Sequence, residues 1–128
     1  MSAIKYTERG FAHPVQYYDV HLYYHVDQPE SHGSAKELHA QLKALFPEMP
    51  IYPMVDRQVG PHTRPMFETH LMNPDMFGRV LSWLCVHRRD HSILVHPNTP
   101  NMLEDHTHNA IWLGPQLPLK LEIFSQHH

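Results

Sequence analysis

Histidine is the residue type in this sequence best suited to chemistry near neutral pH. The chain contains 14 histidines among 128 residues, more than either its 13 acidic or its 10 basic side chains. Imidazole titrates close to pH 7, is the commonest metal ligand among side chains, and carries protons in catalysis. The single cysteine, Cys85, can form neither an internal disulfide nor a thiolate zinc cluster. Any metal site in this chain therefore has nitrogen and oxygen ligands.

Spacing and position remove most of the histidines from that chemistry. His21 and His25 stand four residues apart in a segment that alternates like a strand, which separates them by about 13 Å, too far for one ion. His87 and His91 fall among charged residues where a helix is predicted to end, and a solvated helix end accounts for both. Five more are interpreted as surface or terminal residues: His13, His32, His39, His127 and His128.

Six histidines on separate segments remain as site candidates: His21, His62, His70, His96, His106 and His108. Glu68 is the best carboxylate candidate by strand parity, and Asp105 is expected to orient His106 or another ligand. Histidine and carboxylate ligands with open positions suit non-haem Fe(II) in a two-histidine, one-carboxylate arrangement, and equally suit zinc.

Alternating apolar and polar residues predict the strands that position these side chains. In the first strand, Val20 and Leu22 face one way while His21 and Tyr23 face the other. A proline-interrupted stretch predicts an edge strand, because proline cannot donate to a ladder. The predicted strands span residues 19–27, 51–55 (the edge strand), 66–71, 92–96, 110–113 and 119–124.

Apolar residues at helical spacing predict two amphipathic helices between these strands. The first begins at a capping box made by Ser34 and Glu37 and ends before Pro47. The second begins at Asn73, which is followed by proline at the first helical position, and ends near Arg88.

The order of these elements predicts an α+β, ferredoxin-like fold with a βαββαβ antiparallel sheet and additional C-terminal strands. Right-handed crossovers place both helices on one face of the sheet. The other face then carries His21, Tyr23, Glu68, His70 and His96, with His21 beside both Glu68 and His96. We expect the site in a cleft on this face, covered by the tail strands or by a second subunit.

Composition limits the class of protein. A net charge of −3 lacks the basic excess of a nucleic-acid binder, and 41% hydrophobic residues suffice for one core. The length predicts a single domain over residues 1–128. The first ten residues lack the apolar run of a signal peptide, and no segment is long enough to span a bilayer, so we expect a soluble cytoplasmic protein.

Four segments together resemble the DOPA 4,5-dioxygenase family of small ring-opening oxygenases. They are HLYYHVD at 21–27, GPHTRPMFE at 60–68, LVHPNT at 94–99 and DHTHNAIWLG at 105–114, followed by LPLKLEIF at 117–124. The match runs from about Tyr17 to Phe124, and the His-Pro-x-Thr and Asp-His-Thr pair is specific in combination. The chain departs from the family pattern at Pro100 and Asn101, where the family has glycine and an acid.

The resemblance implies a ferredoxin-like fold and a homodimer. It also implies Fe(II)-dependent extradiol cleavage of a catechol such as DOPA by O2, and zinc could occupy the metal site in a purified preparation. By motif position it implies His21, His62, His96 and His106 as the site histidines. We expect His21, His96 and His106 to be metal ligands and His62 to be the acid/base; His62 could exchange roles with any of the three, and Glu68 could displace one ligand. Tyr23 and Arg64 are expected to contact the aromatic substrate. No nucleic-acid or membrane partner is expected.

Two alternatives stay open at this point. The same ligands could serve a zinc-dependent hydrolase or isomerase with a metal-bound water as nucleophile. The domain could also be a non-enzymatic module that binds a metal or small ligand, since ferredoxin-like domains host many functions.

Overall fold

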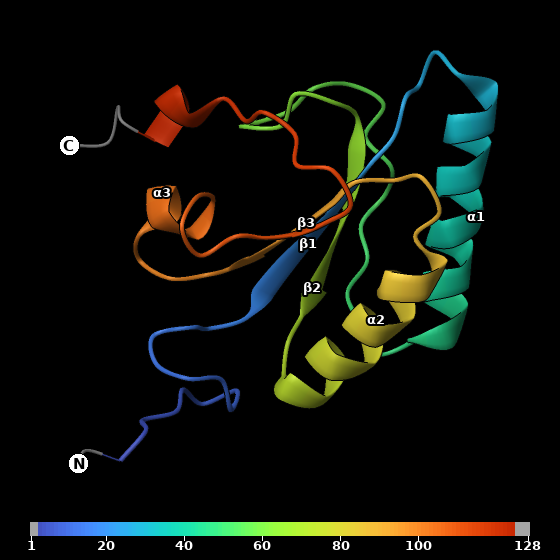
Figure 1. Ribbon diagram of the computed structural model, residues 1–128. Coiled ribbons are helices and arrows are strands. Elements are labelled where there is room, and N and C mark those ends of the chain that lie inside the picture. Colours follow the sequence, from blue (N-terminus) through green and yellow to red (C-terminus); the bar gives the residue numbers. More distant parts are fainter. Residues whose placement is uncertain (1–2, 125–128) are drawn as a thin grey trace.

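The computed structural model describes residues 3–124 as one antiparallel sheet with its two long helices on the same side (Figure 1). His127 and His128 lie outside the described residues. The elements are β1 (Tyr18–Tyr23), α1 (Pro29–Leu45), β2 (Met66–Leu71), α2 (Pro74–His87), β3 (Ile93–Pro97), α3 (Met102–Asp105), β4 (Ile111–Leu113) and the 3-10 helix η1 (Leu121–Phe124). No helix in the described part of the chain is long and apolar enough to cross a membrane.

The sheet has the strand order β2-β1-β3-β4, so β1 is central. Its register pairs Asp19 with His96 of β3 and His21 with Glu68 of β2. The predicted edge strand at 51–55 lies along β2 but forms only two bridges, Ile51 with Thr69 and Val55 with Met66. The topology is the predicted ferredoxin-like one, extended by β4.

The two faces of the sheet bury different sets of side chains, as the alternation predicts. The core between the sheet and the helices includes Leu22 of β1, Phe67 of β2, Val95 of β3 and the α2 residue Leu84. A smaller cluster on the opposite face is formed by Tyr23, Met66, Leu94 and Leu117, with Trp112 packed against it. Figure 1 shows α3, η1 and the chain around them on this second side of the sheet.

The tail differs from the prediction. The strand predicted at 110–113 is confirmed as β4, but the strand predicted at 119–124 is wrong. Leu119 forms a single bridge with His62, and the chain then turns into η1. Pro115 and Pro118 carry no backbone N–H, so the chain leading into this segment cannot sustain a ladder. It instead folds across the open face of the sheet.

The start of the first helix was also predicted wrongly. α1 begins at Pro29 after the N-cap residue Gln28, and β1 already ends at Tyr23. Proline at the first helical position is preorganised for a helix start. Ser34 therefore lies inside α1, where its hydroxyl contacts His91 Nε2 at 2.9 Å instead of capping the helix.

His91 is buried, which corrects the interpretation of a solvated helix end. Its side chain is 5% exposed. Nδ1 donates to the Tyr23 carbonyl at 2.9 Å, while Nε2 accepts from the Ser34 hydroxyl. Burial lowers the pKa of His91, which keeps the ring in the neutral form that this pattern requires. His91 therefore ties α1 and β1 to the turn between α2 and β3.

We expect His91→Ala to lower the free energy of unfolding by about 2–4 kcal/mol, because it removes the buried donor to the Tyr23 carbonyl and leaves a cavity in place of the buried ring. His87→Ala is the matched control: this ring is exposed and bonds only the Trp83 carbonyl, so a change within about 0.5 kcal/mol is expected. Urea unfolding followed by circular dichroism measures both. Equal effects of the two substitutions would contradict the assigned role of His91.

Candidate metal centre

Four histidines from separate segments meet on the open face of the sheet. They are His21 of β1, His62 from the loop before β2, His96 of β3 and His106 immediately after α3; none is more than 9% exposed. With other residues they line a cavity of 210 Å³, which we call the histidine cavity. Its remaining lining residues are Asp19, Pro61, Asn98, Met102, Asp105, Ile123 and Phe124. The sequence-based selection of these four histidines thus picks out side chains that are close together.

Strand register brings His21 and His96 into contact. His96 pairs with Asp19 across the β1–β3 ladder, so it is the diagonal neighbour of His21 on the same face. The two Nε2 atoms are 3.1 Å apart, and the rings stack at an interplanar angle of 15°. His96 Nδ1 donates to the Pro97 carbonyl at 3.0 Å, so in the neutral ring Nε2 carries a lone pair.

Asp19 completes a group that the sequence analysis did not identify. Its Oδ2 lies 3.4 Å from His96 Nε2, and the ligand atoms of Asp19, His21 and His96 all lie within 4.8 Å of one another. The signal was present in the sequence, because Asp19 precedes His21 by two residues and so shares its strand face. The sequence analysis favoured Glu68 instead.

Glu68 is engaged elsewhere. Its Oε2 accepts from His70 Nε2 at 2.7 Å, and His70 Nε2 also lies 3.3 Å from Asp19 Oδ1. Asp19, Glu68 and His70 form a second group with ligand-like spacing, which shares Asp19 with the first. His70, which the motif comparison gave no role, is therefore a neighbour of the centre.

Burial sets the charge state of the centre. Desolvation, supported by the neighbouring imidazoles, lowers the pKa of His62 and of His96 to about 4 and holds that of His21 well below its usual value. Burial also raises the pKa of Asp19 to about 6, despite the opposing influence of His70. The histidines are thus neutral at pH 7, the form in which imidazole ligates a metal or accepts a proton.

The donor set fits a divalent cation. Among the described residues, the buried atoms Asp19 Oδ1 and His21 Nδ1 have no hydrogen-bond partner, although Asp19 Oδ1 lies within ion-pair distance of His70 Nε2. A nearby cation relieves this costly condition for a carboxylate. Two nitrogens bound at about 2.1 Å to one ion, at a right angle, are about 3.0 Å apart, close to the 3.1 Å found between His21 and His96. The nitrogen and oxygen donors match those of non-haem iron or zinc.

His62 and His106 are held differently. His106 Nδ1 donates to the Met102 carbonyl at 2.7 Å, which leaves the lone pair on Nε2, and the ring lies 4.0 Å from that of His96. His62 Nδ1 instead contacts the Tyr23 hydroxyl at 2.7 Å. A hydroxyl both donates and accepts, so His62 can hold its proton on either nitrogen, whereas His96 and His106 are fixed by carbonyls.

Three other predicted residues lie in different surroundings. Tyr23 is 1% exposed and reaches the cavity through His62. Arg64 lines a separate pocket, with Tyr24, Ser31 and Arg89 among its walls. Asp105 does not orient His106: its carboxylate accepts from both the backbone N–H and the hydroxyl of Thr99. It thereby fastens the loop after β3 to α3.

Comparison with known proteins shows which family this chain resembles. A profile of the Dopa 4,5-dioxygenase family matches residues 18–123. A protein of Botryotinia fuckeliana described as an uncharacterized 21.2 kDa protein is 41% identical over 113 residues, 83% of this chain and 62% of that protein. The DOPA 4,5-dioxygenase of Amanita muscaria is 34% identical over 106 residues, 79% of this chain and 46% of that enzyme.

The fold is shared with a solved structure. A crystal structure from Nostoc punctiforme, described as a candidate dioxygenase, superposes with a TM-score of 0.80 at 30% identity, covering 89% of this chain and 95% of that one. The present chain spans about half to three fifths of the length of the two curated relatives. On the profile match, the identities and the shared fold, the chain belongs to the Dopa 4,5-dioxygenase family.

Proposed function

We propose that this protein is an extradiol ring-opening dioxygenase that acts on a catechol and uses non-haem Fe(II) and O2. The observation that carries the proposal is the two-histidine, one-carboxylate group of His21, His96 and Asp19 beside a cavity of 210 Å³. This ligand set with open positions is typical of non-haem Fe(II) oxygenases. Family membership supports the reaction class, and the name of the Amanita relative supports a catechol substrate.

We assign Asp19, His21 and His96 as the ligands, with His106 as an additional nitrogen donor in the same cavity. The backbone carbonyls that accept from Nδ1 of His96 and His106 orient both rings. When bound, Fe(II) would supply the means to bring a catecholate and O2 together and activate them. The chain itself supplies a dry, shaped site around them.

His62 is the proposed acid/base. Its ring lies 4.2 Å from that of His21, so it borders the ligand group, and burial lowers its pKa to about 4. The neutral ring can take a proton from a substrate hydroxyl at Nε2 and later return it. The Tyr23 hydroxyl at Nδ1 accommodates both protonation patterns by donating to or accepting from the ring. Tyr23 is accordingly a positioning residue in this proposal.

We expect anaerobic reconstitution with Fe(II), followed by a catechol and air, to give catechol-dependent oxygen uptake and a yellow ring-opened semialdehyde. His96→Ala should lose iron and activity, because it removes one of the three proposed ligands and leaves only Asp19 and His21. His62→Gln should retain iron but lower kcat by about 10²–10⁴-fold.

His87→Gln, on the exposed end of α2, is the matched control and should behave as the unaltered protein. Turnover that proceeds with zinc and without oxygen would overturn the proposal. Iron binding that survives both His21→Ala and His96→Ala would show that the ligands lie elsewhere.

Tyr23→Phe separates a positioning role from direct substrate contact. Loss of the hydroxyl removes the partner of His62 Nδ1, so we expect kcat to fall about tenfold or more while KM stays nearly constant. Steady-state oxygen uptake over a range of catechol concentrations measures both parameters. A raised KM with unchanged kcat would instead support the contact with substrate expected from the sequence.

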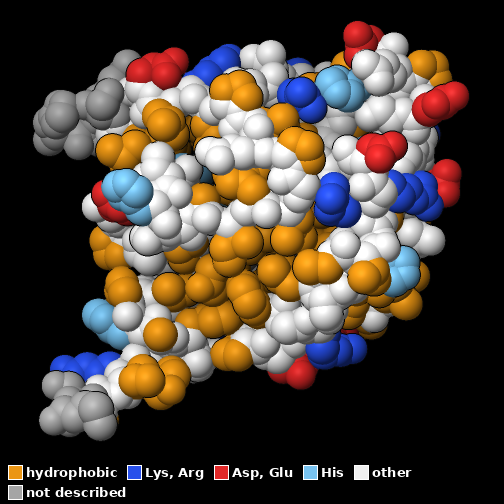
Figure 2. Space-filling model, viewed as in Figure 1, with side chains coloured by type: hydrophobic (Ala, Val, Ile, Leu, Met, Phe, Trp, Pro, Cys, Tyr) orange, Lys and Arg blue, Asp and Glu red, His pale blue; other side chains and the backbone are white. Residues whose placement is uncertain are grey.

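We also propose that the protein is a homodimer that uses the open edge of its sheet. β4 pairs only with β3 in the described sheet order, and its Ile111 is 38% exposed. Figure 2 shows hydrophobic side chains gathered across the middle of the face turned towards the viewer, between α3 and α2. Unpaired edge strands and broad apolar patches are typical of surfaces that associate.

Light scattering after gel filtration should therefore give twice the 15.1 kDa mass of the chain. Ile111→Lys should shift the protein towards the monomer, because it buries a charge in the proposed interface. Leu45→Lys, at an exposed position at the end of α1, should leave the mass unchanged. A monomer at about 100 μM would exclude a stable dimer of this chain.

A further inference from the structure

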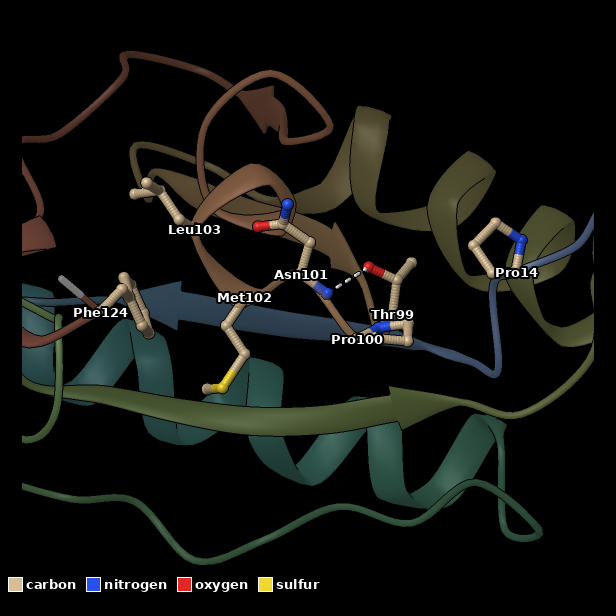
Figure 3. Close-up of a pocket in the computed structure, with 7 residues that line it drawn as sticks. All are labelled: Pro14, Thr99, Pro100, Asn101, Met102, Leu103 and Phe124. Carbon is tan, nitrogen blue, oxygen red and sulfur yellow. Dashed lines mark hydrogen bonds between the residues drawn. The ribbon is translucent and has the colours of Figure 1, made fainter. Parts of the chain in front are cut away.

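A second hollow adjoins the histidine cavity. This outer pocket has a volume of 420 Å³ and is lined by Pro14, Thr99, Pro100, Asn101, Met102, Leu103 and Phe124 (Figure 3). Met102 and Phe124 also line the histidine cavity, so the two spaces share a wall of two side chains. The outer pocket is therefore the neighbour of the histidine cavity on the side of Met102 and Phe124.

The histidine cavity is too small to hold an aromatic ring together with a substituent. A cavity of about 150 Å³ in a protein core is filled by benzene, and the histidine cavity measures 210 Å³. It thus accommodates one six-membered ring with its oxygens and little more. A side chain on the ring must lie outside, and the outer pocket is the adjoining space.

The walls of the outer pocket are unsuited to an anionic substituent. Among the described residues that line either cavity there is no lysine or arginine. The charged groups on or beside the walls are carboxylates: Asp19, Asp105 and Glu104, the residue after Leu103. A carboxylate on the substrate would meet like charge here, since Arg64 lines a different pocket.

Most of the polar groups in the outer pocket are already used. The Thr99 hydroxyl donates to Asp105 at 2.7 Å and accepts from the Asn101 N–H at 3.1 Å, the contact drawn in Figure 3. Asn101 Oδ1 accepts from the Glu104 N–H at 3.0 Å. What remains for a ligand is the side-chain NH2 group of Asn101 and the apolar surface of the two prolines, Met102, Leu103 and Phe124.

We propose that the outer pocket is a substrate subsite for an uncharged, apolar substituent. This chain then prefers alkyl-substituted catechols over catechols that bear a carboxylate, DOPA included. The inference rests on the proposed function for the choice of a catechol ring. Binding, rather than turnover, tests it.

Anaerobic calorimetric titration of the Fe(II)-reconstituted protein compares catechol, 4-ethylcatechol, 3,4-dihydroxyhydrocinnamate, dopamine and DOPA. Each buried methylene contributes about a fourfold gain in affinity, so we expect 4-ethylcatechol to bind about tenfold tighter than catechol. The carboxylate-bearing probes, 3,4-dihydroxyhydrocinnamate and DOPA, should bind no tighter than catechol. Dopamine should bind no tighter than 4-ethylcatechol, because removing its ammonium from water offsets its attraction to the carboxylates. Tighter binding of any charged probe than of 4-ethylcatechol would overturn the inference.

Leu103→Lys tests the location, because Leu103 lines the outer pocket and is absent from the walls of the histidine cavity. The new ammonium should abolish the preference for 4-ethylcatechol and strengthen binding of the hydrocinnamate about threefold or more. Val86→Lys is the matched control, since Val86 is 76% exposed on α2. Identical affinities for all probes in the two variants would place the subsite elsewhere.

The two proposals fail in different ways. Tight, Leu103-dependent binding of 4-ethylcatechol without ring opening would refute the dioxygenase activity and retain the subsite. Ring opening with a preference for DOPA would retain the activity and refute the subsite. Absence of binding by every probe would refute the subsite as well.

Discussion

The register between β1 and β3 is the constraint on which the centre depends. Pairing of Asp19 with His96 places His21 diagonally across from His96 and brings three ligand-type side chains together. Because side chains alternate along a strand, a slip of one residue would send His96 to the helix-covered face and Val95 to the open one. The core residues Val20, Leu22, Ile93 and Val95 forbid that slip. The same packing that stabilises the fold therefore fixes the geometry of the centre.

Desolvation governs the chemistry of the cluster more than any single ion pair does. It is the largest influence on His21, His62, His96 and Asp19, and it pushes each towards its neutral form. Neutral imidazoles can be packed 4–5 Å apart without the repulsion that protonated rings would suffer. The rings then differ in what their Nδ1 atoms contact. Backbone carbonyls accept from Nδ1 of His96 and His106, whereas Nδ1 of His62 contacts the Tyr23 hydroxyl.

Local alternation predicted the sheet, its two faces and the shared face of His21 and His96, because a period of two is visible in neighbouring residues. The selection of His62 and His106, which lie in loops, came from the resemblance to the family. What the alternation missed depends on contacts distant in sequence. Asp19 gains its place from the β1–β3 register, and His91 is buried because α1 packs Ser34 against it. Ser34 and Glu37 match a capping pattern, yet Pro29 starts the helix earlier. The apolar alternation at 119–124 did not give a strand, because Pro115 and Pro118 deprive the chain leading into this segment of ladder donors.

The tail that lies across the open face has a consequence for biosynthesis. The walls of the histidine cavity extend from Asp19 near the start of the fold to Phe124 at the end of the described chain. Contacts between residues so far apart in sequence form only once both have left the ribosome. A nascent chain that already has β1, α1 and β2 still lacks His96, His106 and the covering segment. The complete cavity, and the binding of any molecule that needs all of its walls, is therefore possible only after the whole domain has been translated.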